Sequence, residues 1–134
     1  MVPKFRAWDK ENDRMIYPST EGVCFELDDD GINILDVSGD YPEDHTFPAI
    51  DSFLMQSTGL KDKNGVEIFE GDVLTSNVQP CKMVNPIKDG YGVVRFENGM
   101  FKLGAISLVT FISKMEVIGN IYENPELLEQ ANEN

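Results

Sequence analysis

The 134-residue chain is long enough for one domain with a hydrophobic core, since folding at this size buries about two thirds of the surface of the unfolded chain. Hydrophobic residues make up 41% and charged residues 26%, and no apolar run reaches the ~18 residues that cross a bilayer, which argues against a helical membrane protein. The formal net charge of −13 disfavours binding to nucleic acids and anionic membranes.

Two β-hairpins are predicted near the N-terminus. Residues 4–8 alternate between polar and apolar side chains, and a polar turn over 9–14 leads to a second short strand at 15–17. Residues 22–27 and 32–37 flank the sequence Asp-Asp-Asp-Gly, whose final Asp-Gly pair we expect at the bend. This part of the chain is therefore expected to be an irregular β segment.

The loop that follows, at 39–48, separates that segment from a second series of strands. Two turns in this series contain Asn-Gly, the dipeptide that most readily takes positive φ at both central positions of a tight hairpin: Asn64-Gly65 and Asn98-Gly99. Residues 76–90 contain two prolines and no periodicity, which predicts a long insertion. The expected strands cover residues 53–56, 66–69, 73–75, 91–96, 100–103, 108–112 and 115–121.

The C-terminus carries the best helix signal. Asn124 is a good N-cap, Pro125 suits the first helical position, and Glu126 favours the positive end of the helix dipole. We expect a short helix that docks through Leu127 and Leu128.

Short strands separated by Gly, Asn and Asp favour a small barrel or sandwich. The predicted fold is mainly β, with a small SH3-like barrel, additional N-terminal β-hairpins and the short C-terminal helix. We treat residues 1–134 as a single domain, with a possible subdivision into an irregular β segment at 1–50 and the barrel at 51–128.

Three blocks of sequence carry a resemblance to a known family. They are Lys4-Phe5-Arg6-Ala7-Trp8, the run from Met55 to Val73 with its two glycine turns, and the run from Glu116 to Leu128. In this order they resemble the YopX family of phage and prophage proteins over nearly the whole chain. The resemblance implies a phage-derived protein and supports the barrel, and it implies no biochemical activity, because none is established for the family.

No arrangement of residues typical of a metal site is found. Glu26, Asp28, Asp30 and Gly31 have the alternating spacing of a calcium loop, but Val37 stands where a calcium loop needs its bidentate Glu. An acidic hairpin tip in water explains these residues better. Cys24 and Cys81 lack the spacing of a metal or redox motif and are expected to stay reduced in the cytoplasm, since no export signal precedes them.

Catalysis is equally unsupported by the sequence. The only histidine, His45, lies in a predicted loop near Asp44 and Ser52, and adjacency in a loop is a weak sign of a catalytic triad. We therefore expect no catalytic residues, no metal and no cofactor.

Two surfaces are the candidates for binding. The first combines Arg6 and Trp8, which share one face of the first strand, with polar residues of the other family blocks; its members are Arg6, Trp8, Lys61, Asp62, Asn120 and Tyr122. For Trp8 the favoured alternative is packing against the body of the protein. For Asp62 the alternative is structural, since its carboxylate can accept backbone N–H groups of its own turn.

The second candidate surface is acidic. No Lys or Arg occurs between Met15 and Leu60, whereas ten acidic residues do: Glu21, Glu26, Asp28, Asp29, Asp30, Asp36, Asp40, Glu43, Asp44 and Asp51. Such a region suits the steering of a basic protein partner. We expect Asp28, Asp29, Asp30 and Asp36 to form this surface.

These features predict a cytoplasmic, non-catalytic accessory protein that binds a host or phage protein. One alternative is a nucleic-acid-binding barrel that would use Lys61, Lys63, Lys82, Lys88 and Arg95. Another is an acidic mimic of DNA, which would need the ten carboxylates in ordered rows. Self-association through exposed strand edges is a further expectation.

Overall fold

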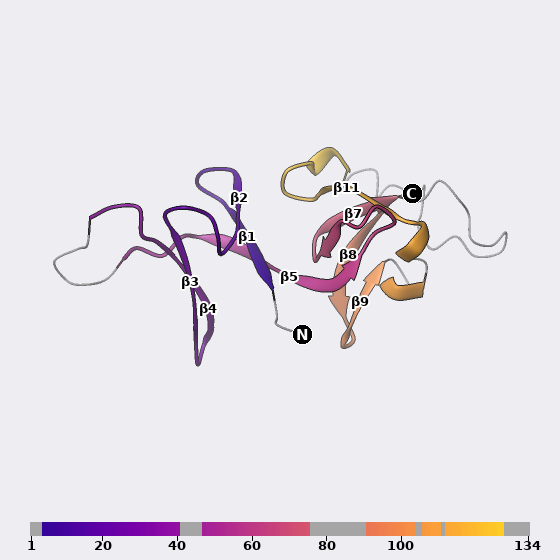
Figure 1. The fold of residues 1–134 in the computed structure, drawn as a ribbon, viewed down its shortest axis with the longest axis horizontal. Helices are drawn as coiled ribbons and strands as arrows, with labels where there is room; N and C mark the ends of the chain where they lie inside the picture. Colours follow the sequence, from indigo (N-terminus) through magenta and orange to yellow (C-terminus); the bar gives the residue numbers. More distant parts are fainter. Residues whose placement is uncertain (1–3, 41–46, 76–90, 104–105, 111, 128–134) are drawn as a thin grey trace. The chain divides into compact units, whose positions relative to one another are not determined.

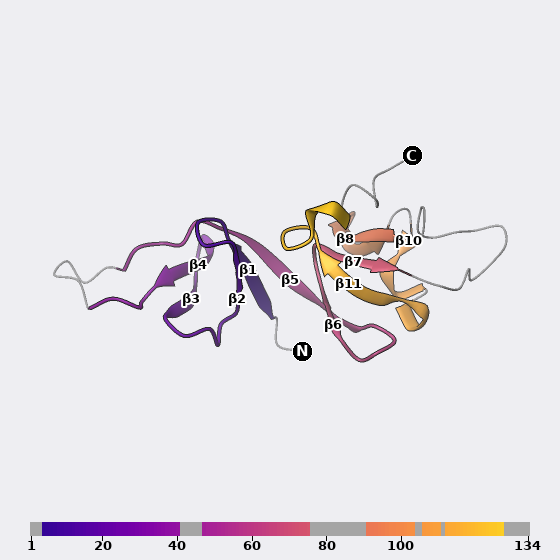
Figure 2. The ribbon, with the colours of Figure 1, turned by 90° about the horizontal axis from the view of Figure 1, so that it is seen from above.

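The computed structural model describes residues 4–40, 47–75, 91–103, 106–110 and 112–127 (Figures 1 and 2). The chain divides into two compact units. The N-terminal unit is Phe5–Met55, and the C-terminal unit combines Gln56–Asn134 with Met1–Lys4. The division falls within the long strand β5 (Ser52–Lys61), so one strand contributes residues to both units.

The N-terminal unit opens with the predicted hairpin. Strand β1 (Phe5–Asp9) pairs antiparallel with β2 (Arg14–Ile16) in the register Ala7↔Ile16. On its other side β1 is bonded to β5, so β1 has a neighbour at both edges. The polar turn between the two strands lies where the sequence places it.

The second hairpin forms a separate two-stranded sheet. Strand β3 (Val23–Asp28) pairs with β4 (Gly31–Asp36), and the last pair is Asp28↔Gly31. The bend is therefore Asp29-Asp30, one residue earlier than predicted. Gly31, with φ of 124°, opens β4 instead of forming the bend.

Alternation along this hairpin builds the core of the N-terminal unit. One face of the sheet presents Val23 and Ile34, which are buried, while the opposite face carries Cys24 and Leu35 and, toward the tip, the polar residues Glu26, Asp28 and Asn33. The buried cluster consists of Ala7, Ile16, Val23 and Ile34, with Phe25, Ile32 and Ile50 packed against it. Residues 41–46 of the predicted loop lie outside the described residues.

The C-terminal unit contains a curled antiparallel sheet (Figure 1). Its strands are β7 (Asp72–Thr75), β8 (Tyr91–Glu97), β9 (Met100–Leu103), β10 (Ile106–Ser107) and β11 (Glu116–Asn120), in the spatial order β10-β9-β8-β7-β11. The last strand thus pairs with the first, and 3-10 turns precede it, as in SH3-like barrels. The predicted mainly β fold is confirmed.

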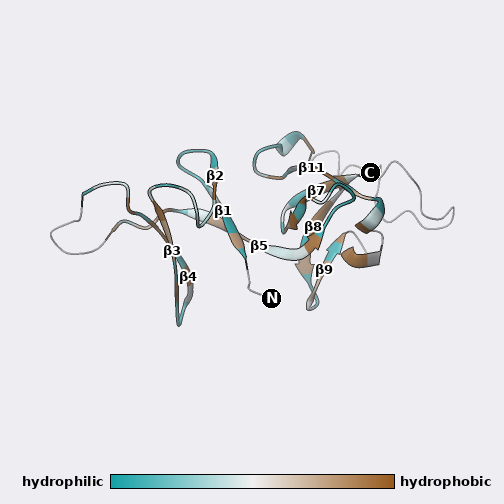
Figure 3. Ribbon diagram, viewed as in Figure 1, coloured by the Kyte–Doolittle hydropathy of each residue, from teal (hydrophilic) through white to brown (hydrophobic). Residues whose placement is uncertain are grey.

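Two further strands and a compact core complete this unit. The last part of β5 pairs with β6 (Glu67–Phe69), which the turn at Glu70-Gly71 connects to β7. The buried cluster consists of Ile68, Leu74, Val94, Leu103, Leu108 and Met115. The cluster thus includes residues of β6, β7, β8 and β9, and Figure 3 shows brown, hydrophobic segments on β7 and β8.

The Asn64-Gly65 turn differs from the prediction. The pair Lys61↔Glu67 leaves residues 62–66 as the loop, and of the two central residues only Gly65 has positive φ, at 81°. By contrast, Asn98 and Gly99 have φ of 53° and 79° between the paired residues Glu97 and Met100, as the sequence predicts. The loop at 62–66 is longer because Asp62 closes it with its own carboxylate.

The strand predicted at 108–112 is wrong. Leu108–Thr110 and Ile112–Lys114 form 3-10 helices instead. Leu108 is buried while Val109 beside it is 59% exposed, and the tight turns carry the chain from β10 to β11. Apolar content alone does not separate a short buried strand from such turns.

At the C-terminus, residues 125–127 are helical, and Leu128 lies outside the described residues, as does the predicted insertion at 76–90. A Cβ added to Gly119 would lie 2.4 Å from Asn124 Oδ1 and 2.9 Å from Leu127 Cδ1. The absence of a side chain at Gly119 therefore lets the first helical turn pack directly on β11.

Candidate functional site

The structure divides the first candidate surface between the two units. Arg6 and Trp8 belong to the N-terminal unit, and Lys61, Asp62, Asn120 and Tyr122 belong to the C-terminal unit. Arg6 is only 7% exposed and its neighbour Ala7 is fully buried, so both faces of β1 are covered at this point. Arg6 is therefore not an exposed cation, and Trp8 is half-buried, which fits the alternative that Trp8 packs against the body of the protein.

Asp62 is a structural residue of the loop at 62–66. It is 6% exposed, and its carboxylate accepts N–H groups from Asn64 at 2.8 Å, Val66 at 2.9 Å and Val117 at 2.9 Å. The last bond connects the loop to β11. Burial alone would raise the pKa of Asp62, but these backbone hydrogen bonds, with Lys63 nearby, hold it below its ordinary value.

Asn120 has a similar role at the end of β11. Its side-chain oxygen accepts the N–H groups of Tyr122 at 3.0 Å and Glu123 at 2.9 Å, and the residue is buried. The Asn120 N–H in turn donates to the side chain of Asn124 at 3.2 Å. The amide of Asn120 is thus used to form the turn that leads to the C-terminal helix.

The remaining two members of this surface are more accessible. Lys61 is exposed at the end of β5, and Tyr122 is half-buried. Burial and the charge of Glu70 raise the pKa of Tyr122, and Arg95 opposes them. Tyr122 therefore stays a neutral phenol at pH 7.

A buried carboxylate that the sequence analysis missed is Asp9, which is 1% exposed. It accepts N–H groups from Glu11 at 3.1 Å and Asn12 at 3.3 Å, and the Arg14 Nε lies 3.2 Å away. Burial opposes its ionisation, but these hydrogen bonds and that of the Asn12 side chain outweigh burial and lower the pKa of Asp9. The signal was an Asp at the start of a polar turn, which is a common position for backbone capping.

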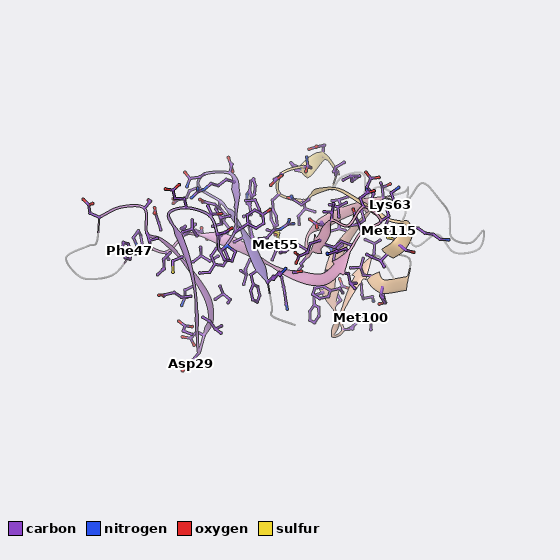
Figure 4. All side chains as sticks on the ribbon, viewed as in Figure 1. Asp29, Phe47, Met55, Lys63, Met100 and Met115 are labelled. Atoms are coloured by element: carbon purple, nitrogen blue, oxygen red, sulfur yellow. The ribbon has the colours of Figure 1, made fainter. Side chains whose placement is uncertain are left out.

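The acidic candidates lie on the β3–β4 hairpin. Asp28, Asp29 and Asp30 are exposed at its tip, and Figure 4 shows Asp29 pointing away from the ribbon. The Asp28 carboxylate accepts the Asp30 N–H at 2.8 Å and the side-chain amide of Asn33. For Asp29 and Asp30, no hydrogen bond or ion pair joins the carboxylate to another residue within the described ranges.

Asp36 lies at the opposite end of this hairpin and is not part of the tip. It is half-buried, and hydrogen bonds from the Ser38 hydroxyl and N–H lower the pKa of its carboxyl. The tip instead includes Glu26 and Leu27, which are both exposed. Leu27 is 79% exposed, the highest value among the large hydrophobic residues of the described chain.

A second exposed group lies on the β8–β9 hairpin. Phe96 is 51% exposed and stacks edge-on with Phe101, its cross-strand partner, at a centroid distance of 5.0 Å. On the other face of the same hairpin, Arg95 and Lys102 are directly opposite. Two cations in this position repel each other, so this pair does not stabilise the hairpin.

The residues considered for metal binding or catalysis do not form a site that the structure describes. His45 and Cys81 lie outside the described residues, and within these residues no group of three His, Cys, Asp or Glu side chains could hold a metal ion. Cys24 is a free thiol. No helix in the described part of the chain is long and apolar enough to cross a membrane.

Comparison with known proteins identifies the family. The family model described as YopX protein matches residues 4–129, which is nearly the entire chain. The chain belongs to the YopX family. A comparison with curated proteins gives no match.

Two solved structures of similar proteins agree with this assignment. Protein EF1440 from Enterococcus faecalis is 32% identical, and the match covers 96% of this chain and 99% of that chain with a TM-score of 0.61. Protein yopX from Bacillus subtilis is 24% identical, with coverage of 94% and 95% and a TM-score of 0.55. The predicted YopX resemblance is confirmed, and the fold is shared with both proteins.

Proposed function

We propose that this YopX-family protein is a phage-derived, non-catalytic accessory protein that binds a basic host or phage protein in the bacterial cytoplasm. The observation that carries the proposal is the tip of the β3–β4 hairpin. There, Leu27, an apolar side chain that is 79% exposed, is flanked in sequence by the exposed acidic residues Glu26 and Asp28, and Asp29 and Asp30 follow at the bend. Carboxylates steer a basic partner toward the protein, and an apolar anchor adds binding energy once water is displaced.

Other carboxylates of the protein are paired within the fold, which supports the tip as the binding surface. Asp9 and Asp62 are buried and accept backbone N–H groups, and Asp51 forms an ion pair with Lys10 at 3.2 Å. These groups are already compensated within the fold. The charges of Glu26, Asp29 and Asp30 have no such compensation among the described residues, so they are available to an external partner.

The test is a binding experiment with the full chain and two variants of equal charge. E26Q/D29N/D30N neutralises the tip, and E11Q/E123Q/E126Q removes three exposed charges elsewhere. Proteins from a bacterial lysate are captured at low and high salt after nuclease treatment. A partner that the wild type and the second variant retain at low salt, and that the tip variant loses, supports the proposal; equal capture by all three proteins contradicts it.

The nucleic-acid-binding alternative has one observation in its favour, the β8–β9 hairpin. Arg95 and Lys102 provide two exposed or half-buried cations, and Phe96 provides an aromatic ring on which a base could stack. Of the other predicted cations, Lys63 is paired with Glu116 at 3.6 Å, and Lys82 and Lys88 lie outside the described residues. Fluorescence polarisation with a single-stranded oligonucleotide tests this function, and R95Q/K102Q should abolish any binding.

The DNA-mimic alternative is a special case of the protein-binding proposal. Its partner would be a DNA-binding protein, which duplex DNA would displace from the wild-type chain. Adding duplex DNA to the capture experiment therefore separates a mimic from a protein that binds another kind of basic surface.

A further inference from the structure

We infer that the outer edge of β3 is a docking site for an extended basic segment of the partner, which adds to the β3–β4 sheet as a third strand. The inference rests on the proposed function and names its binding mode. It follows from the hydrogen-bonding register of the hairpin, from the exposed side chains near its tip and from the charge around them.

The register shows which backbone groups of β3 face outward. Ile34 and Asp36 on β4 bond away from β3, because the Ile34 carbonyl accepts the Ile50 N–H at 2.8 Å and the Asp36 N–H donates to the Pro48 carbonyl at 2.9 Å. In an antiparallel pair, a residue that bonds outward lies opposite another that bonds outward. The partners of Ile34 and Asp36 are Phe25 and Val23, so the backbone N–H and C=O groups of these two β3 residues point away from β4.

Leu27 continues this alternation two residues after Phe25. The N–H and C=O groups of Phe25 and Leu27 therefore point to the side of β3 on which no strand of the described residues pairs with it. The outward N–H of Val23 is bonded to Thr20, whereas those of Phe25 and Leu27 have no backbone partner in the part of the chain that the structure describes. Four backbone groups near the tip are thus ready to accept a strand.

The side chains of β3 define what such a strand should contain. Phe25 and Leu27 lie on the apolar face of the hairpin, and Glu26 and Asp28 lie on its polar face. An added strand would place its own side chains alternately beside these two faces. A segment that alternates apolar and basic residues would extend the apolar face and pair its cations with Glu26 and Asp28.

The acidic residues of β3 favour a basic segment at this edge over the β3 strand of a second copy of the chain. Pairing of β3 with β3 would bring Glu26 and Asp28 of one copy against the same residues of the other, with Asp29 and Asp30 nearby. Like charges opposite each other across strands are destabilising. The acidic residues therefore disfavour pairing of two β3 edges and favour pairing with a basic strand. Charged residues on edge strands commonly prevent unwanted strand pairing in this way.

The experiment uses two synthetic peptides of the same composition and charge. One alternates lysine and valine, and the other places all lysines before all valines. Only the first presents a cationic and an apolar face as a strand. We expect the wild-type protein to bind the alternating peptide about tenfold more tightly, which corresponds to one or two additional hydrogen bonds.

The decisive variant is L27P. Proline removes the outward N–H of Leu27 and no hydrogen bond of the hairpin, because that N–H does not bond to β4. The matched control is I32P, since Ile32 lies opposite Leu27 and directs its N–H to the other edge of the sheet. L27P should lose the preference for the alternating peptide, and I32P should retain it.

The outcomes separate this inference from the proposed function. If E26Q/D29N/D30N weakens binding but L27P still prefers the alternating peptide, docking at the β3 edge is wrong and the acidic surface stands. If neither the charge variant nor L27P changes binding, both ideas are wrong. Self-association of the chain that L27P abolishes would show that the occupant is a second copy.

Two measurements keep the test informative if L27P fails to fold. Equal affinity of the two peptides for the wild-type protein overturns the inference without any variant. Amide hydrogen exchange by NMR gives a direct readout: the peptide should slow exchange at Phe25 and Leu27 and leave Glu26 and Asp28 unchanged, because only the former face the added strand. Uniform protection along the hairpin would contradict a strand at this edge.

Discussion

Asp62 in the C-terminal unit and Asp29 in the β3–β4 hairpin are the same chemical group in opposite settings. Asp62 is buried and accepts three backbone N–H groups, one of them from β11. Asp29 is exposed at a two-residue bend and bonds to no other described residue. The comparison teaches that local sequence chemistry does not distinguish a carboxylate that stabilises the fold from one that faces solvent; burial and the position of N–H donors do.

The largest effect expected from this comparison is the loss of stability on removing the Asp62 carboxylate. D62A leaves three N–H groups without their acceptor, which should lower the free energy of unfolding by about 3 kcal/mol. Urea denaturation followed by circular dichroism measures the change. D29A is the matched control and should change stability by less than about 0.5 kcal/mol; similar losses in the two variants would contradict the distinction.

The second-largest loss of stability is expected where the backbone of β11 packs closely against the C-terminal turn. G119A places a methyl group against Asn124 Oδ1 and Leu127 Cδ1, so the C-terminal turn must move away from β11, at a cost of about 2 kcal/mol. Gly39 in the N-terminal unit has open space around its Cα, and G39A should be nearly neutral. Thermal unfolding of the two variants provides the comparison, and an unchanged melting temperature for G119A would refute the close packing.

A smaller loss of stability is expected when the pH is lowered. The pKa of Asp9 and that of Asp62 are below the ordinary value of 3.8, so the unfolded chain binds protons more readily than the folded one. The stability that these carboxylates provide is complete above about pH 5 and decreases as the pH falls through 3.8 and below. In urea titrations between pH 7 and pH 2, the difference between wild type and D62N should shrink toward the acid end; a constant difference would exclude a pKa effect at Asp62.

The smallest effect on stability should come from the tip of the β3–β4 hairpin. D29N/D30N removes two exposed charges from a strongly acidic surface, and the free energy of unfolding should stay within about 0.5 kcal/mol of the wild type. The same variant should show weaker, less salt-dependent capture of a basic partner. A large stability loss would mean that the tip is part of the folded framework.

The sequence was sufficient for elements whose signal is local. Asn98-Gly99 takes positive φ at both residues and closes the β8–β9 hairpin as predicted, because the turn type depends on those two residues alone. The hairpin of β1 and β2 and the hairpin of β3 and β4 also follow from alternation and polar turns. The YopX resemblance predicted more of the fold than any of these local patterns did.

Predictions failed where a residue's role depends on distant parts of the chain. Arg6 has the residue type and strand position of a surface cation, yet it is buried, because both faces of β1 are covered at this point of the folded chain. The strand predicted at 108–112 became 3-10 turns, because the chain there must cross from β10 to β11 while burying Leu108. Neither constraint is visible in the residues themselves.

The sequence by itself determined the mainly β composition, the two-residue bend at Asn98-Gly99 and the acidic character of the N-terminal half, since each depends on neighbouring residues. Only the tertiary structure decided which carboxylates accept hydrogen bonds within the fold and which strand edges have no pairing strand among the described residues. Asp62 became a structural residue through a hydrogen bond from Val117, 55 positions away. Residues 48 and 50 bond to β4, whereas no strand within the described ranges pairs with the outer edge of β3. Hydrogen bonds between distant segments, and the burial that accompanies them, are properties of the folded chain.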